Sequence, residues 1–103
     1  MRNSRVNDIV KTLREYGINP TIVDPWANRE AARKEYGVEL TALEDVRDAD
    51  CVILAVAHRE FQALGVDGLK TLYGDRQTKI LIDVKGMFDL NQLKKTDIRW
   101  WRL

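Results

Sequence analysis

The sequence predicts an α/β fold with a parallel sheet, and two observations carry that prediction. Apolar runs of strand length recur along the chain, most clearly at residues 51–57 and 79–84. They are nearly continuous rather than alternating, which is typical of strands covered on both faces. Long segments with helical spacing separate them, as in crossovers between parallel strands. We therefore expect a three-layer α/β/α, Rossmann-like sheet.

The first part of the chain predicts two helices and two short strands. Ser4 is a suitable N-cap for a helix, and Gly17 supplies the residue that tolerates a left-handed C-terminal turn. Pro25 cannot donate to a ladder, so a β-branched run ends at Asp24. The expected elements are a helix over 4–16, a strand over 21–23, a helix over 29–36 and an edge strand over 38–40.

The second part predicts two buried strands and the helices that connect them. Thr41 and Glu44 have the spacing of a capping box that opens a short helix. The strand over 51–57 follows, and its connection is a helix broken near Gly65 and ended at Gly74. After the strand over 79–84, residues 89–95 predict a last helical turn or two.

Composition indicates one ordinary globular domain, residues 1–103, and excludes several kinds of partner. A formal charge of +1 gives no electrostatic reason to expect nucleic acid or an anionic membrane. One cysteine and one histidine provide neither an internal disulfide nor an ordinary zinc site. The first residues lead to no signal-peptide apolar core, so we expect a cytoplasmic setting.

Polar residues follow three of the predicted strands, at 24–26, 58–60 and 83–86. Parallel strands would bring these ends to one edge, where ligands gather in such sheets. A helix N-terminus after His58 and the cation of Lys85 would suit that edge to a phosphate. The alternatives are structural: His58 as a capping or partly buried residue, Lys85 as a solvated lysine, and Asp24 as a turn residue. Cys51 begins a buried strand and is expected to be a core residue rather than a nucleophile.

The sequence contains no Gly-x-Gly-x-x-Gly, Walker motif, nucleophile elbow or metal-ligand cluster, so it shows no complete catalytic apparatus. Four short motifs nevertheless occur in order. They are Arg2-Asn3-Ser4-Arg5-Val6, Val23-Asp24-Pro25-Trp26, Ala55-Val56-Ala57-His58-Arg59-Glu60-Phe61 and Asp83-Val84-Lys85-Gly86-Met87-Phe88-Asp89. From Arg2 to Phe88 the chain resembles the C-terminal, UDP-binding domain of the UDP-glucose/GDP-mannose dehydrogenase family. The Ala-Val-Ala-His stretch and the Trp-Arg-Leu ending are most similar to the branch that acts on UDP-N-acetylhexosamines for surface polysaccharides.

The resemblance implies a UDP-sugar-binding part of an NAD-dependent enzyme that oxidises a sugar C6 alcohol to a carboxylate. Such enzymes hold NAD on an N-terminal Rossmann domain and use a cysteine nucleophile from a middle region, and Cys51 does not match that cysteine. The 103-residue chain alone is therefore expected to be inactive and to bind no cofactor itself. By motif position, Lys85 and Arg2 are the expected substrate-binding residues, together with Gly86 and His58.

The resemblance also implies that a strand and a Phe-Lys loop, which in the family precede the Arg2 motif, are missing here. We expect a sheet without the family's first, central strand. Either rearrangement closes the gap, or a strand is borrowed from a second copy of the chain, which would be self-association. Nucleotide binding is expected to be weakened. The expected partners are a UDP-sugar, the remainder of the parent dehydrogenase and a second copy of the chain. Two alternatives remain: a non-catalytic assembly module, and a receiver-like domain using Asp24 and Lys85 but lacking the usual paired acids.

Overall fold

A computed structural model describes residues 4–24, 30, 33–34, 37 and 40–102, and divides the chain into two compact units, Met1–Asp45 and Val46–Leu103. Each unit is described by itself. Among the described residues, no helix combines the length and the apolar character needed to cross a membrane.

The first unit begins with helix α1, Ser4–Glu15. Its end is set by Gly17, whose φ of 78° lets the Ile18 N–H donate to the Leu13 carbonyl at 2.9 Å. This confirms the predicted helix and its stop. Val10 is buried, whereas Tyr16 is 80% exposed and adds nothing to the core.

In the described part of this unit, a parallel bridge between Ile22 and Leu40 stands where two short strands were predicted. Residues 38 and 39 of the second predicted strand lie outside the described residues. The Thr41 N–H donates to the Ile22 carbonyl at 2.9 Å beside it. Most of the helix predicted over 29–36 lies outside the described residues, although Glu30, Arg33 and Lys34 are helical. The predicted capping box leads only to a 3-10 turn, η1, Leu43–Asp45.

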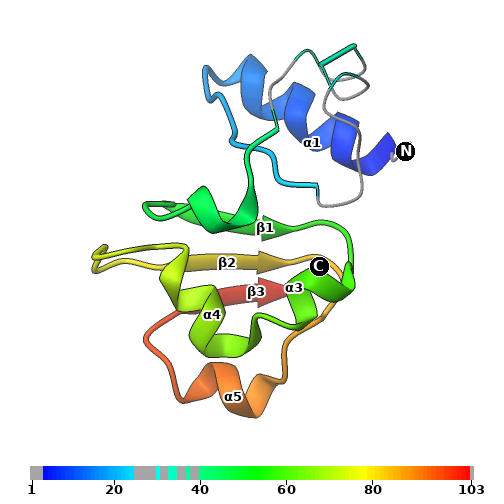
Figure 1. The fold of residues 1–103 in the computed structure, drawn as a ribbon. Helices are drawn as coiled ribbons and strands as arrows, with labels where there is room; N and C mark the ends of the chain where they lie inside the picture. Colours follow the sequence, from blue (N-terminus) through cyan, green and yellow to red (C-terminus); the bar gives the residue numbers. More distant parts are fainter. Residues whose placement is uncertain (1–3, 25–29, 31–32, 35–36, 38–39, 103) are drawn as a thin grey trace. The chain divides into compact units, whose positions relative to one another are not determined.

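The second unit is built on three parallel strands (Figure 1). They are β1, Cys51–Leu54, β2, Ile80–Asp83, and β3, Arg99–Arg102, in the order β1-β2-β3. This confirms the predicted α/β class with a parallel, Rossmann-like sheet. Strand β1 ends earlier than predicted, and β3 was not predicted at all. The expected lack of a family strand stays a prediction.

The connections follow the predicted helices closely. A broken helix joins β1 to β2 as α3, Arg59–Gln62, and α4, Gly65–Thr71, because Gly65 interrupts it with a φ of 63°. Helix α5, Leu90–Lys94, precedes β3. The Asp89 carboxylate caps α5 by accepting from the Asn91 N–H at 2.8 Å.

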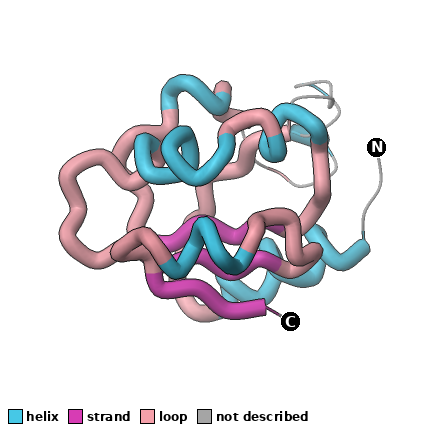
Figure 2. The backbone as a smooth tube through the Cα atoms, turned by 90° about the horizontal axis from the view of Figure 1, so that it is seen from below, coloured by secondary structure: helices cyan, strands magenta, loops and turns pink. Residues whose placement is uncertain are grey.

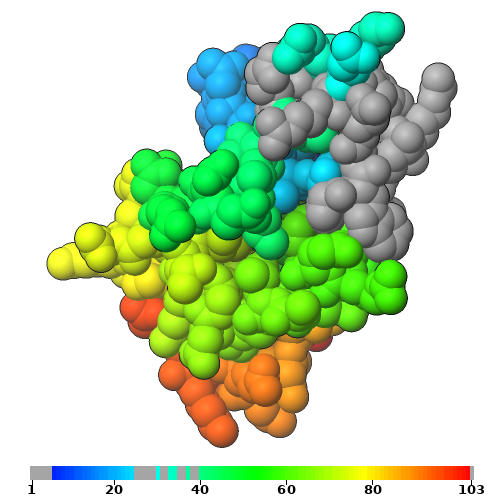
Figure 3. Space-filling view, viewed as in Figure 1, coloured from blue at the N-terminus to red at the C-terminus, as the bar shows by residue number. Residues whose placement is uncertain are grey.

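Helices α3 and α4 lie over one face of the sheet (Figures 1 and 2). In the space-filling view, residues of the β1–β2 connection cover this face, and little of the sheet is visible (Figure 3). Leu69 and Tyr73 of this connection and Leu81 of β2 are fully buried. The Tyr73 hydroxyl donates to the Ile80 carbonyl at 2.6 Å, so its polar end is satisfied.

Cys51 differs from its prediction as a core residue. It is exposed at the start of β1, because burial along this strand rises only towards Leu54. Partial burial of the thiol, with the Asp50 charge nearby, raises the pKa of Cys51, which opposes formation of a reactive thiolate. The interpretation of Cys51 as core was wrong, but nothing about its environment activates it as a nucleophile.

Candidate functional site

The carboxyl ends of the three strands are level with one another. Leu54 pairs with Asp83, and Asp83 pairs with Arg102, so each strand's last residue lies in one row. The chain leaves β1 and β2 at this edge, which we call the strand-end edge. In open parallel sheets this is where ligands bind. Cys51 lies at the opposite ends of the strands, paired with Ile80.

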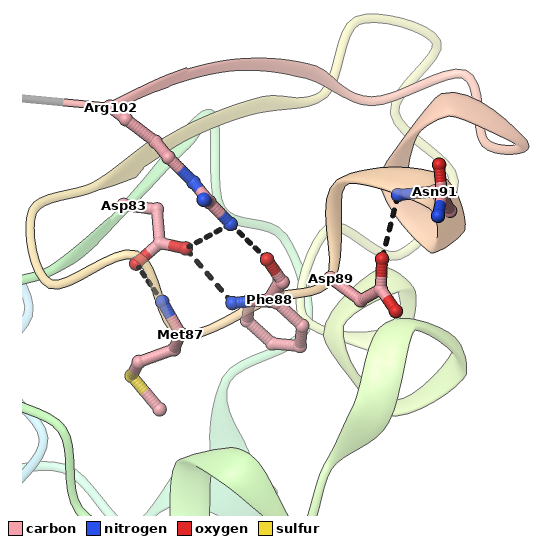
Figure 4. Close-up of polar contacts among 6 residues, drawn as sticks. All are labelled: Asp83, Met87, Phe88, Asp89, Asn91 and Arg102. Carbon is pink, nitrogen blue, oxygen red and sulfur yellow. Dashed lines mark hydrogen bonds and ion pairs between the residues drawn. The ribbon is translucent and has the colours of Figure 1, made fainter.

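Asp83 organises the turn that follows β2. Its side chain is fully buried, and its two carboxylate oxygens accept hydrogen bonds from the Met87 N–H at 3.0 Å and the Phe88 N–H at 3.1 Å (Figure 4). Hydrogen bonds to a buried carboxylate offset much of its desolvation cost. One side chain therefore holds the loop over 84–88, which we call the Asp83 loop.

The tip of the Asp83 loop is Lys85-Gly86, and both residues are exposed. Gly86 closes the turn: its N–H donates to the Asp83 carbonyl at 3.3 Å, and its φ of 66° lies in the left-handed region that favours glycine. Among the described residues, none forms an ion pair with Lys85. The loop thus presents an exposed cation at the strand-end edge, where the sequence predicted it.

Arg102, the last residue of β3, reaches back to the same loop. Its Nη2 donates to the Phe88 carbonyl and lies 4.0 Å from Asp83 Oδ2 (Figure 4). The guanidinium carbon is 3.7 Å from the point that a Cβ on Gly86 would occupy, so the group lies against Gly86. The side chain is 34% exposed, so part of it remains open to solvent. It also gives the buried Asp83 carboxylate a nearby positive charge.

His58 occupies the loop after β1 and is only 7% exposed. It is the N-cap of α3 without a capping bond from its side chain, while its carbonyl accepts from the N–H groups of Phe61 and Gln62. Its ring meets the Phe61 ring edge-on, with centroids 5.4 Å apart. This matches the structural alternative for His58. Helix α3 has only 4 residues, so the dipole expected to favour a phosphate is small.

The structure does not test the other residues to which the sequence analysis pointed. Arg2, Pro25 and Trp26 lie outside the described residues, and Asp24 belongs to the first unit. Within the second unit, the structure brings together Lys85, Gly86, Asp83 and Arg102. Asp83 and Arg102 were not among the substrate-binding residues predicted from the sequence. Asp83 binds the backbone of the loop, and Arg102 donates to its Phe88 carbonyl. The aromatic run before Arg102 favours a strand, which was the available signal for β3.

Comparisons with known proteins give the family of the chain. A family model described as the UDP binding domain of the UDP-glucose/GDP-mannose dehydrogenase family matches residues 1–90. The UDP-N-acetyl-D-glucosamine 6-dehydrogenase of Pseudomonas aeruginosa is 36% identical over 99 residues, which cover 96% of this chain and 22% of that protein. The protein of the same name from Salmonella typhi is 31% identical over 99 residues, with coverage of 96% and 22%.

Protein CapL of Staphylococcus aureus is 30% identical over 103 residues, covering 100% of this chain and 23% of that protein. No solved structure matches the chain significantly. The chain belongs to the UDP-glucose/GDP-mannose dehydrogenase family and corresponds to its UDP-binding domain. It spans between 22% and 23% of the length of these relatives.

The described residues do not fit NAD, the cofactor that the resemblance implies for the parent enzyme. A dinucleotide pyrophosphate needs a glycine-rich turn after a strand, so that the backbone can approach it closely. The turn after β1 is Ala55-Val56-Ala57-His58, and it contains no glycine. No step of NAD chemistry can be assigned to these residues.

Proposed function

We propose that this chain binds the UDP moiety of a UDP-sugar within a nucleotide-sugar 6-dehydrogenase. The strand-end edge with Lys85 at the tip of the Asp83 loop carries the proposal. A diphosphate is the anionic part of such a substrate, and a lysine held on a rigid turn binds phosphate as a point charge. The family model over residues 1–90 supports this ligand class.

The parent enzyme in this proposal is NAD-dependent and acts on a UDP-N-acetylhexosamine. It oxidises the C6 alcohol to a carboxylate and supplies a UDP-hexuronic acid for polysaccharide biosynthesis in the cytoplasm. Two relatives whose names specify UDP-N-acetyl-D-glucosamine 6-dehydrogenase support this assignment. NAD and the catalytic cysteine belong to other parts of the parent enzyme. The chain, residues 1–103, acts as one substrate-binding domain and is inactive alone.

The proposed contacts differ in kind from residue to residue. Lys85 interacts with a phosphate, and Gly86 closes the turn that carries Lys85, because its positive φ favours glycine. His58 is mostly buried, so its part is to shape the strand-end edge rather than to present a large contact surface. Arg2 remains a substrate-binding candidate on motif grounds.

Amide chemical shifts during a UDP titration test the proposal. Saturable shifts should appear at Gly86 and its neighbours, with a smaller response at His58. The variant Lys85→Gln should weaken binding about tenfold, which is the loss of one charge-assisted contact. Lys94→Gln, which removes an exposed lysine from α5, is the matched control and should leave binding unchanged. If millimolar UDP produced no saturable shift, the proposal that this chain binds UDP would be wrong.

A second candidate function is assembly with a further copy of the chain. In the described part of the second unit, β3 pairs only with β2, and Trp101 on β3 is 53% exposed. An edge strand with an exposed aromatic side chain favours association. Sedimentation over a range of concentrations tests it: a monomer that stays unchanged with concentration would exclude self-association.

A further inference from the structure

The segment Met87–Phe88 is held from two directions. Asp83 accepts from both of its N–H groups, at 3.0 and 3.1 Å, while Arg102 donates to the Phe88 carbonyl. The backbone N–H and carbonyl of Phe88 are therefore both bound by charged side chains, which come from the adjacent strands β2 and β3 (Figure 4). Along the chain, the loop tip, Lys85-Gly86, lies between Asp83 and the bound segment Met87–Phe88.

We propose that Arg102 is a positioning residue for substrate binding: it fixes the Asp83 loop so that Lys85 meets the substrate diphosphate. This rests on the proposed function of the strand-end edge. Arg102 acts through Lys85 rather than on the phosphate, because its polar contacts among the described residues are to Phe88 and Asp83.

The geometry explains why an arginine fits this place. Its planar guanidinium lies against Gly86, with its carbon, Nη1 and Nε each 3.7 or 3.8 Å from the Cβ point of that residue. The same group donates to a carbonyl and faces a carboxylate, which a planar fork of donors can do in one orientation. A lysine would offer a point charge but no flat surface to support Gly86.

The burial of Asp83 makes the arrangement stiff. Burying the Asp83 carboxylate costs free energy unless hydrogen bonds and a nearby cation compensate for the lost water. Moving Arg102 therefore weakens the field at Asp83 as well as the bond to Phe88. Both changes loosen the same loop, and Lys85 moves with it.

The test compares Arg102→Gln with Arg99→Gln in the full chain. Arg99 lies on the same strand, is exposed, and its side chain makes no polar contact with the described residues, so its replacement removes the same charge without touching the loop. Hydrogen exchange of the Met87 and Phe88 amides reports on the loop without any ligand. Exchange should be about tenfold faster in Arg102→Gln and unchanged in Arg99→Gln. Unchanged exchange in Arg102→Gln would overturn the proposal.

A double-mutant cycle with Lys85→Gln then separates positioning from direct contact. Arg102→Gln should weaken UDP binding about fivefold when Lys85 is present and leave it unchanged when Lys85 is already glutamine. Losses that add in the double variant would show that Arg102 itself binds phosphate and would overturn the positioning role. If the unaltered chain binds no UDP, the proposed function fails, whereas the exchange experiment still decides whether Arg102 holds the loop.

Discussion

Two loops leave the sheet at the strand-end edge, and they are built in opposite ways. After β2, a buried carboxylate binds the backbone of the Asp83 loop and leaves Lys85 exposed at its tip. After β1, the only histidine turns inward against Phe61. The difference is that the Asp83 loop exposes a cation, as the proposed UDP binding requires, whereas the loop after β1 buries its polar side chain. A polar residue at a strand end in the sequence therefore does not by itself indicate a ligand site.

The largest effect on stability is expected at Asp83, whose side chain holds the Asp83 loop. Asp83→Asn should lower the free energy of unfolding by about 3 kcal/mol, because the amide cannot accept from both N–H groups and leaves Arg102 without a counter-charge. Urea unfolding measures it. Asp89→Asn is the matched control, since asparagine also caps a helix and should change stability by less than about 0.5 kcal/mol. Equal losses in the two variants would mean that burial of Asp83 does not matter.

A smaller effect on stability, and a different one on binding, is expected at the β1 loop. His58→Ala should cost about 2 kcal/mol, because it removes a buried ring from its contact with Phe61. Under conditions in which the variant is folded, its UDP affinity should change by less than about twofold. Arg59→Ala, an exposed neighbour, is the control for stability. A tenfold loss of affinity would show that His58 contacts the ligand and would end the contrast between the loops.

The smallest effect is expected at the opposite end of the strands, where Lys79 Nζ lies 3.0 Å from Asp97 Oδ2 in an exposed ion pair. The hydrogen bond from Lys79 lowers the pKa of Asp97 below its usual value. A carboxyl whose pKa is lower in the folded state stabilises the protein above its unfolded-state pKa, and this contribution is lost as the pH falls through the lowered value.

Asp97→Asn should therefore reduce stability slightly at neutral pH, much less than Asp83→Asn, and the difference from the unaltered chain should vanish in acid. Added salt should shrink it as well. Urea midpoints at neutral and acid pH measure the effect. A difference that persists in strong acid would assign the effect to packing rather than to the charge of Asp97.

Several elements could be predicted from the sequence because local signals dominate them. Gly17 and Gly65 end or break helices by their own conformational freedom, and Asp89 caps α5 with its own side chain. The apolar run before Asp83 placed β2 correctly to within one residue at each end. The position of Lys85 followed from that strand.

Other features depend on contacts that sequence patterns do not specify. Strand β3 is an edge strand with charged residues at both ends, so its apolar signal is short and ambiguous. The exposure of Cys51 follows from its place at the margin of the sheet, not from its neighbours in sequence. Arg102 contacts Phe88 across 14 residues of sequence, so this contact depends on the tertiary fold. His58 packs against Phe61 because the chain turns sharply between them.

In the proposed function, the charge of Lys85 on the Asp83 loop recognises the diphosphate of the ligand. Isothermal titration of UDP and of uridine into the unaltered chain and into Lys85→Gln tests it directly. We expect the unaltered chain to prefer UDP over uridine by at least about tenfold, and Lys85→Gln to lose most of that preference while keeping its affinity for uridine. An equal preference for UDP in both proteins would contradict the claim and place the phosphate elsewhere.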